Sequence, residues 1–253
     1  MRCYLTVCLI LFTCILSCAA NLEVLKNQEE ASRNLGEIYL RQKNYTLALR
    51  EFLKAEKLYD KDPFLQNDLG LVYLAKDRFD LAIDHFNKAL DIKPDYAPAR
   101  NNLGTAYMSK KDWDTAIACF KELTGNLLYA TPHYPLSNLG WAYYNKKKYG
   151  LAEKYYKEAL KIQPKFIVAL IGLGRTYMAV GKSADAIEVF ERTVKYFPAT
   201  AEVYFDLAGA YKLSHDYNKA LNAYNKVVDL VPETPLADKA AKEAGKMKNL
   251  LFY

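Results

Sequence analysis

A pattern that returns every 34 residues constrains this chain of 253 residues more than any other feature. Its most regular part is a Leu-Gly pair followed by Tyr three residues after the Gly, with Ala in place of Gly in the last copy. The pair begins at Leu35, Leu69, Leu103, Leu139, Leu173 and Leu207, so successive copies lie 34, 34, 36, 34 and 34 residues apart. Ala follows twelve residues after the Gly position, and an aromatic residue follows four residues later, in every copy. Such a chain is predicted to stack similar units in a row.

Each copy is predicted to form two amphipathic helices joined by a short turn. In the third copy these helices are expected near residues 98–110 and 112–123. Gly104 is small enough to let the two helices approach closely, and Tyr107 and Phe120 fill the space beside it. A larger residue at Gly104 would overpack this contact at a cost of roughly 1–3 kcal/mol. The recurring aromatic residues are therefore interpreted as core and indicate no cofactor site.

The repeated Leu-Gly, Tyr, Ala and aromatic positions resemble the tetratricopeptide repeat. This resemblance implies an all-α fold, a right-handed solenoid of six helix-turn-helix repeats with a C-terminal capping helix. The repeats are expected at residues 29–62, 63–96, 97–132, 133–166, 167–200 and 201–234, and the capping helix and tail at residues 235–253. The third repeat is two residues longer than the others, and this insertion is interpreted as neutral drift, as a bend in the solenoid or as a contact loop.

The first residues have the pattern of an export signal. Arg2 precedes an uncharged run from Tyr4 to Ser17. This run is short for a bilayer-spanning helix but suits the core of a signal peptide. An ordinary secretory signal cut near Ala20, or an uncleaved anchor, is one interpretation of the segment.

A lipidated N-terminus is the interpretation that we favour. The segment Ile15-Leu16-Ser17-Cys18 resembles the bacterial lipobox. This resemblance implies a signal peptide at residues 1–17, cleavage before Cys18, lipidation of Cys18 and a lipidated tether at residues 18–28. Because Ala19 rather than Asp follows the cysteine, the lipoprotein is expected in the outer membrane, facing the periplasm.

Composition argues against several function classes. The net charge of +6, from 35 basic and 29 acidic residues, is modest for a nucleic-acid-binding protein. The sequence has no nucleophile elbow, no phosphate-binding loop and no Cys/His cluster with metal-ligand spacing. Cys119 is expected to be a buried small residue, and the lysines at 146–148 are expected to form a solvated turn or to contact anionic lipid. We therefore expect a protein that is not an enzyme and has no cofactor, metal, nucleic-acid partner or small-molecule substrate.

The first helix of each repeat is expected to supply a partner-binding groove. By resemblance to other tetratricopeptide repeats, the groove residues are Phe64, Asn67, Leu71, Leu74, Asn101, Thr105, Met108, Tyr134, Ser137, Trp141, Tyr144, Asn145, Ile171, Arg175, Met178 and Phe205. Aromatic residues and Met are favoured at protein interfaces, although part of this apolar set is expected to pack between repeats. The groove is predicted to bind an extended or helical apolar segment, whose backbone would hydrogen-bond to Asn67, Asn101 and Asn145.

A narrower resemblance is to the type IV pilus biogenesis/stability lipoproteins, the pilotins. It rests on six repeats behind a lipobox-like start and on the longer third repeat. That repeat begins with Asn101-Asn102-Leu103-Gly104, and Leu127-Leu128-Tyr129 precedes the Asn138-Leu139-Gly140 of the next. The resemblance implies a scaffold that binds an outer-membrane secretin and helps it to reach the membrane and to multimerise. The alternative is a periplasmic adaptor for cell-wall hydrolases or outer-membrane assembly factors, since one fold serves many functions.

Overall fold

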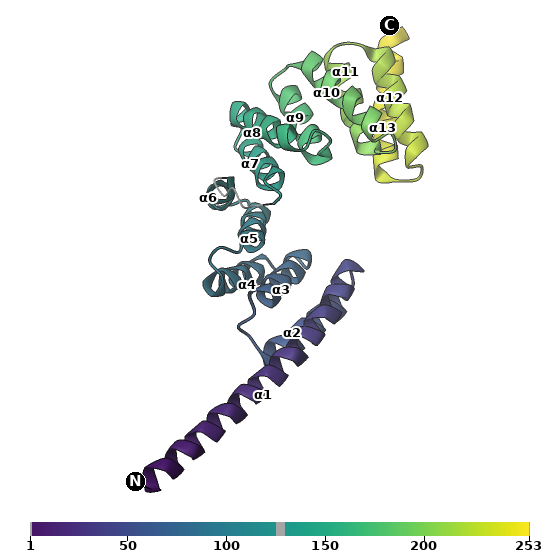
Figure 1. The fold of residues 1–253 in the computed structure, drawn as a ribbon. Coiled ribbons are helices and arrows are strands. Elements are labelled where there is room, and N and C mark those ends of the chain that lie inside the picture. The colour runs from purple at the N-terminus through teal and green to yellow at the C-terminus, as the bar shows by residue number, and fades with distance from the viewer. Residues whose placement is uncertain (1, 125–129, 253) are drawn as a thin grey trace. The chain divides into compact units, whose positions relative to one another are not determined.

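The computed structural model describes residues 2–124 and 130–252, with side chains for 21–124 and 130–251. These residues form helices joined by short turns and loops (Figure 1). In chain order the helices are α1 (Arg2–Arg41), α2 (Tyr45–Leu58), α3 (Pro63–Ala75), α4 (Phe79–Ile92), α5 (Ala97–Ser109), α6 (Trp113–Thr124), α7 (His133–Asn145), α8 (Tyr149–Ile162), α9 (Ile167–Ala179), α10 (Ser183–Tyr196), α11 (Ala201–Leu213), α12 (Tyr217–Leu230) and α13 (Pro235–Phe252). The predicted all-α class is confirmed for these residues. The Leu127-Leu128-Tyr129 stretch and the side chain of Cys18 lie outside the described part.

The chain divides into two compact units, residues 1–119 and 120–253, and each is described by itself. Within the first unit α1 packs on α2, α3 packs on α4, and α2 and α4 each contact the first helix of the next repeat. Within the second unit the pairs are α7 with α8, α9 with α10, and α11 with α12. Each of the helix pairs α1–α2, α3–α4, α7–α8, α9–α10 and α11–α12 corresponds to one copy of the sequence repeat.

A glycine in the first helix and an aromatic ring in the second form the central contact of four repeats. A Cβ placed on Gly36 would lie 2.4 Å from a ring carbon of Phe52, and a Cβ on Gly174 would lie 2.5 Å from a ring carbon of Phe190. The same contact joins Gly70 to Phe86 and Gly140 to Tyr156. The phenylalanine rings of these pairs are fully buried. The close approach that the sequence predicts at the repeat glycine is therefore confirmed in these four repeats.

The turn inside each repeat contains one residue with a left-handed backbone. These residues are Lys43, Asp77, Lys111, Lys147, Gly181 and His215, with φ between 56° and 76°. The next residue donates its N–H to the carbonyl of the repeat's tyrosine, as Lys148 does to Tyr143 at 2.9 Å. This arrangement closes the C-terminus of the first helix in the manner of a left-handed cap.

The last helix covers the end of the repeat array. In α13, the side chains of Ala237, Ala240, Ala244 and Met247 are buried, and their spacing of three, four and three residues places them on one helical face. This face packs on α12. The predicted capping helix is thus present and reaches Phe252.

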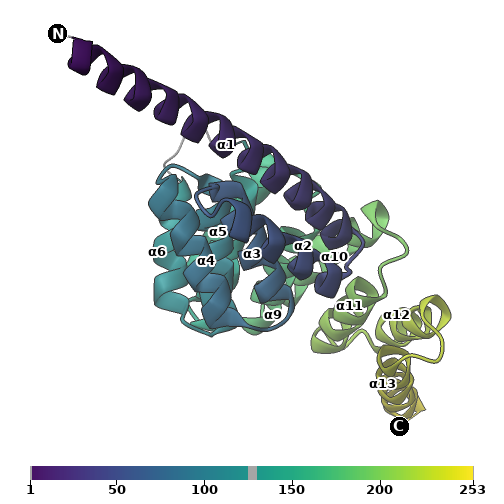
Figure 2. The same cartoon turned by 90° about the horizontal axis from the view of Figure 1, so that it is seen from below.

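The N-terminal helix α1 is continuous from Arg2 to Arg41, so residues 18–28, expected to be a tether, are helical and lead directly into the first repeat (Figure 2). Within the part of the chain that the structure describes, no helix combines the length and apolarity needed to cross a bilayer.

Arg33 connects α1 to α3 through four carboxylates. Its guanidinium nitrogens lie 4.0 Å from Glu29, 3.1 Å from Glu37, 3.3 Å from Asp62 and 3.8 Å from Asp68. Burial, reinforced by Asp62, raises the pKa of Glu29 to about 7. Burial, reinforced by Glu37, raises the pKa of Asp68 to about 7. One cation thus faces an excess of negative charge, and two of the carboxyls hold protons into the neutral range.

We predict that Gly174→Ala destabilises the second unit by roughly 1–3 kcal/mol, because the new methyl group would collide with the buried Phe190 ring. Gly150→Ala is the matched control. No atom lies within 4 Å of a Cβ placed at Gly150, so this change should be neutral or stabilise the helix by up to about 1 kcal/mol. Urea unfolding followed by circular dichroism measures both, and equal midpoints for the two variants would contradict the close-contact interpretation.

The Arg33 cluster predicts a pH dependence of stability. The ordinary pKa values of Glu29 and Asp68 are 4.5 and 3.8, so between about pH 4 and pH 7 the folded state holds protons that the unfolded chain has released. The cluster's contribution to the free energy of unfolding therefore falls as pH rises through this window. Asp68→Asn should match the wild type at pH 4 and be more stable at pH 8.

Urea midpoints across this pH range test the prediction, with Asp95→Asn, at an exposed carboxyl, as control. A difference between Asp68→Asn and the wild type that stays constant with pH would rule out the buried carboxyl as its cause.

Candidate protein-binding surfaces

Two surfaces expose apolar side chains from the first helices of the repeats, one in each unit. The α7–α9 surface consists of Trp141, Tyr144, Val168, Ile171, Arg175 and Met178. The α3–α5 surface consists of Phe64, Leu71, Leu74, Asn101 and Met108. Trp141, Val168 and Phe64 are 39%, 55% and 41% exposed, and the remaining members are half-buried.

Stacked aromatic rings form one part of the α7–α9 surface. Trp141 and Tyr144 are three residues apart and share one face of α7. Their ring centroids are 5.8 Å apart and their planes differ by 9°. Tyr149, at the start of α8, packs edge-on against Tyr144 at 5.6 Å. Rings supported in this way form a broad apolar face with little freedom to reorganise, which is typical of protein-binding anchors.

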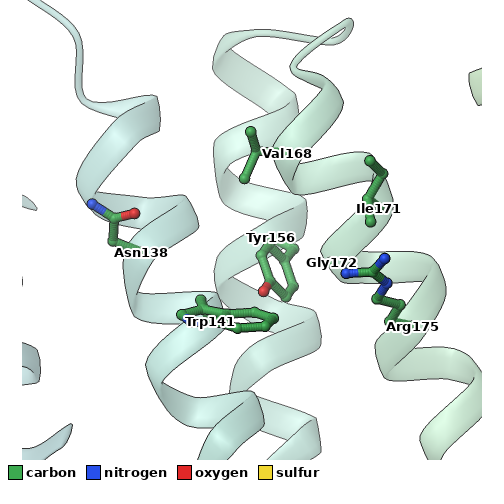
Figure 3. Close-up of a pocket in the computed structure, with 7 residues that line it drawn as sticks. All are labelled: Asn138, Trp141, Tyr156, Val168, Ile171, Gly172 and Arg175. Carbon is green, nitrogen blue, oxygen red and sulfur yellow. The ribbon is translucent and has the colours of Figure 1, made fainter. Parts of the chain in front are cut away.

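A cavity of about 350 Å³ opens between α7 and α9 on this surface (Figure 3). Its lining residues are Asn138 and Trp141 from α7, Tyr156 from α8, and Val168, Ile171, Gly172 and Arg175 from α9. Figure 3 shows the Tyr156 ring between Trp141 and Gly172. The walls are mostly apolar, and the polar groups lie at Asn138, Tyr156 and Arg175. An apolar hollow with a few polar groups is the usual form of a site for a small ligand or an anchoring side chain.

An ion pair fixes Arg175 at the edge of the cavity. Its Nε donates to Oδ2 of Asp206 in α11 at 2.8 Å. Burial raises the pKa of Asp206, and Arg175 opposes that rise. Met178, one turn after Arg175, packs against α11, where its Cε lies 3.1 Å from a Cβ placed on Gly209. Arg175 is thus held in a defined orientation, whereas Met178 contributes mainly to packing between repeats.

The α3–α5 surface is built around Phe64. This ring packs edge-on against Tyr96 at 5.2 Å, and the cations of Arg33 and Lys93 lie 5.6 and 5.4 Å from its centroid. Leu71 and Leu74 pack against the core cluster that contains Ile83, Phe86 and Leu103. The Phe64 ring therefore already contacts two cations of the chain itself. The two leucines contribute chiefly to packing between repeats.

The structure corrects the role expected for Asn67. Asn67 is only 5% exposed, and its Oδ1 accepts a hydrogen bond from Asn102 Nδ2 at 2.9 Å. Its position therefore lies between adjacent first helices and not on an open groove. Asn145 is half-buried, and its Nδ2 donates to the carbonyl of Trp141 in its own helix at 2.9 Å. Ser137, also expected to line the groove, is 2% exposed for the same positional reason as Asn67.

The remaining groove residues lie partly accessible on the first helices. Asn101 and Thr105 are half-buried, and the carbonyl of Asn101 accepts a hydrogen bond from the Thr105 hydroxyl at 3.0 Å. Tyr134 is exposed and contacts Phe166 edge-on at 5.2 Å. Phe205 packs against Tyr224 at 5.4 Å. Cys119 is buried, as expected.

Four residues of the cavity were missed from the sequence, namely Asn138, Tyr156, Val168 and Gly172. Tyr156 is buried in the core, as predicted for the aromatic residue of every repeat, and it also lines the cavity. The available signal was Gly172, since a second glycine occurs two residues before the Leu-Gly glycine in this repeat alone.

Comparison with solved structures reveals similar helical arrays in other proteins. The crystal structure of PilW, described as a widely conserved type IV pilus biogenesis factor, matches with a TM-score of 0.79 at 24% identity over 84% of this chain and 98% of PilW. PilF of Pseudomonas aeruginosa matches with a TM-score of 0.73 at 19% identity, over 87% of this chain and 99% of that chain. At these identities the likeness shows the fold.

Sequence comparison shows the same repeat. A human protein named Protein O-mannosyl-transferase TMTC1 is 30% identical over 100 residues, which are 40% of this chain and only 11% of that protein. Models of the tetratricopeptide repeat match residues 27–95, 73–126, 134–166 and 171–235. These matches coincide with the helix pairs and their glycine–aromatic contacts. The chain therefore belongs to the tetratricopeptide repeat proteins.

Proposed function

We propose that this tetratricopeptide-repeat scaffold assists type IV pilus biogenesis by binding a secretin and promoting its localisation and multimerisation at the outer membrane. The observation that carries the proposal is the length of the match to two pilus proteins. PilW and PilF are covered over 98% and 99% of their chains, with TM-scores of 0.79 and 0.73. Both matches combine near-complete coverage with a TM-score above 0.7.

The proposed mechanism needs no catalysis. A lipid on Cys18 would hold the protein to the periplasmic face of the outer membrane, and the repeats would bind secretin protomers there. Several acyl chains hold a membrane firmly, whereas one holds it weakly. Linking the membrane anchor to the protein-binding surface raises the local concentration of secretin at the membrane without any new contact.

The α7–α9 surface is the part of the scaffold best suited to bind the partner. Its exposed ring at Trp141 is stacked on Tyr144, and the cavity beside it is open to solvent. Asn67 and Ser137, by contrast, are buried, and Phe64 is already contacted by cations of the chain itself.

The first prediction concerns the secretin ring. Outer membranes from cells without this gene, analysed unboiled on a gel and probed for secretin, should lack the high-mass multimer and retain secretin monomer. Restoring the gene should restore the multimer. An unchanged multimer in the deletion strain would disprove the secretin role.

A second prediction concerns the anchor. Cys18→Ala should leave the protein folded but absent from the outer-membrane fraction, because lipidation needs the thiol. Circular dichroism of the purified variant and fractionation of cells give the two readouts. Recovery of Cys18→Ala in the outer membrane would contradict lipid anchoring and leave the secretin prediction to be judged separately.

A third prediction concerns the binding surface. Trp141→Ala should weaken binding to the purified periplasmic part of the secretin by about tenfold or more, as loss of a central aromatic anchor does. Leu151→Ala is the matched control, since Leu151 in α8 is 38% exposed and Trp141 is 39% exposed. Biosensor titrations compare the two variants, and equal affinities would move the secretin site off the α7–α9 surface.

A further inference from the structure

A bridging position connects the first helices of neighbouring repeats. It lies two residues before the glycine of the Leu-Gly pair, or before its Ala substitute in the sixth repeat, and holds Asn34, Asp68, Asn102, Asn138, Gly172 and Asp206 in the six repeats. Three of these side chains bond back to the preceding first helix. Asp68 pairs with Arg33, Asn102 donates to Asn67, and Asp206 accepts from Arg175. Gly172 has no side chain, so it can make no such bridge between α7 and α9.

The identity of the bridging residue correlates with that of the core aromatic residue in the previous repeat. In the second helix of the previous repeat, the core aromatic residue is Phe when the bridging residue is Asp68, Asn102, Asn138 or Asp206. It is Tyr156 when the bridging residue is Gly172. The only other tyrosine at this position is Tyr224, and the residue at the corresponding place in the capping helix is Ala240. Tyrosine thus occurs where the bridging residue is small, and phenylalanine occurs where it is Asn or Asp.

The structure explains this pairing at Gly172. A Cβ on Gly172 would lie 2.2 Å from Cζ of Tyr156 and 2.5 Å from its hydroxyl oxygen. The hydroxyl end of Tyr156 therefore occupies space that a bridging side chain would need. The open remainder of that space is the cavity between α7 and α9, walled by Trp141, Val168 and Ile171 (Figure 3).

The sixth repeat indicates what kind of group covers such a tyrosine. There the ring of Phe205 packs edge-on against Tyr224, with centroids 5.4 Å apart and planes at 67°. The residue that corresponds to Phe205 in the fourth repeat is Ser137, which is too small to reach across in the same way. The chain thus supplies an aromatic cover for Tyr224 from its own repeat and has only a serine at that place beside Tyr156.

The charges around the cavity favour an uncharged ligand group. The cation of Arg175 is balanced by Asp206, to which its Nε donates at 2.8 Å. A guanidinium has further N–H donors on its terminal nitrogens. Burial raises the pKa of the Tyr156 hydroxyl, which stays protonated at neutral pH and can also donate. A main-chain carbonyl can accept from both donors without bringing a second negative charge next to Asp206.

We propose that this cavity binds one aromatic side chain from an uncharged internal segment of a partner protein, whose main-chain carbonyl accepts hydrogen bonds from Arg175 and Tyr156. The proposal rests on the scaffold function above in requiring a protein partner, but it does not require that the partner be a secretin.

The test uses a double variant that gives the fourth and fifth repeats the common pattern. Tyr156→Phe with Gly172→Asn reproduces the Phe86 and Asn102 pair and fills the cavity. The change to Phe removes the hydroxyl, and the ring must also shift, because a Cβ on Gly172 would meet its Cζ and Cε1 at 2.2 and 2.4 Å. Gly172→Asn alone would strike Tyr156, so it is not used. Tyr224→Phe is the matched control, because it removes the hydroxyl of the corresponding tyrosine away from the cavity.

The probe is N-acetyl-phenylalanine methylamide, which carries one aromatic ring and uncharged carbonyls. The full chain is held in lipid nanodiscs and carries Trp113→Phe, so that 5-fluorotryptophan reports from Trp141 alone, since the sequence has two tryptophans. Fluorine resonances are followed during titration. The expected result is a saturable shift with a dissociation constant on the order of 1 mM, as befits a ligand of this size.

The double variant should bind the probe at least tenfold more weakly, and Tyr224→Phe should bind it normally. N-acetyl-glycine methylamide should give no saturable shift, and N-acetyl-phenylalanine with a free carboxylate should bind more weakly than the methylamide. Thermal unfolding by circular dichroism confirms that the variants fold.

Equal affinity of the wild type and the double variant, or no saturable shift in the wild type, would overturn the proposal. If N-acetyl-phenylalanine with a free carboxylate bound more tightly than the methylamide, the proposal that the acceptor is an uncharged carbonyl would be wrong. Probe binding with an intact secretin ring in the deletion strain would reject the pilus role alone. Loss of the ring without probe binding would reject the aromatic cavity alone.

Discussion

The packing of an aromatic ring over a glycine is the contact on which the rest of each repeat depends. Gly70 and Gly174 lack the Cβ that would collide with Phe86 and Phe190 at 2.5 Å, so the two helices of the repeat can approach closely. The left-handed residue in the turn then determines how the chain returns along its own first helix. With these two features fixed, the outer face of each first helix is left to pack against neighbours or partners.

Contacts between repeats are more varied than contacts within them. The first two repeats are joined through Arg33 and its carboxylates, the next through two asparagines, and the last two through Arg175 and Asp206. Each is a polar bridge between partly buried side chains, and buried polar groups need such partners. The exception at Gly172 leaves the polar bridge unmade and the α7–α9 surface open. The exposed ring of Trp141, stacked on Tyr144, thus lies beside the one bridging position without a side chain.

The repeat pattern alone predicted the helix pairs, their turns, the glycine–aromatic packing and the capping helix. These depend on contacts between residues a fixed distance apart in the sequence. Position within a single helix was a poorer guide to the groove, because Asn67 and Ser137 face an adjacent repeat and are buried. The cluster around Arg33 was also missed, since Asp62 and Asp68 are far from Arg33 in the sequence and only the packing of α1 on α3 brings them together. To predict the cavity, one would have to notice both the exceptional glycine at position 172 and the tyrosine at 156 that partly fills the space beside it.

A repeat array can tolerate such exceptions because its contacts are local. Each repeat touches only its neighbours, so stability is approximately the sum of the repeats and their interfaces. The missing side chain at Gly172 therefore changes the α7–α9 interface alone. The remaining contacts of that interface include Tyr156, which packs against both Gly140 and Gly172 and therefore joins two repeats with one ring. Tyr156 thus offsets the missing polar bridge through its contacts with both repeats. The cavity beside its ring remains available to a partner.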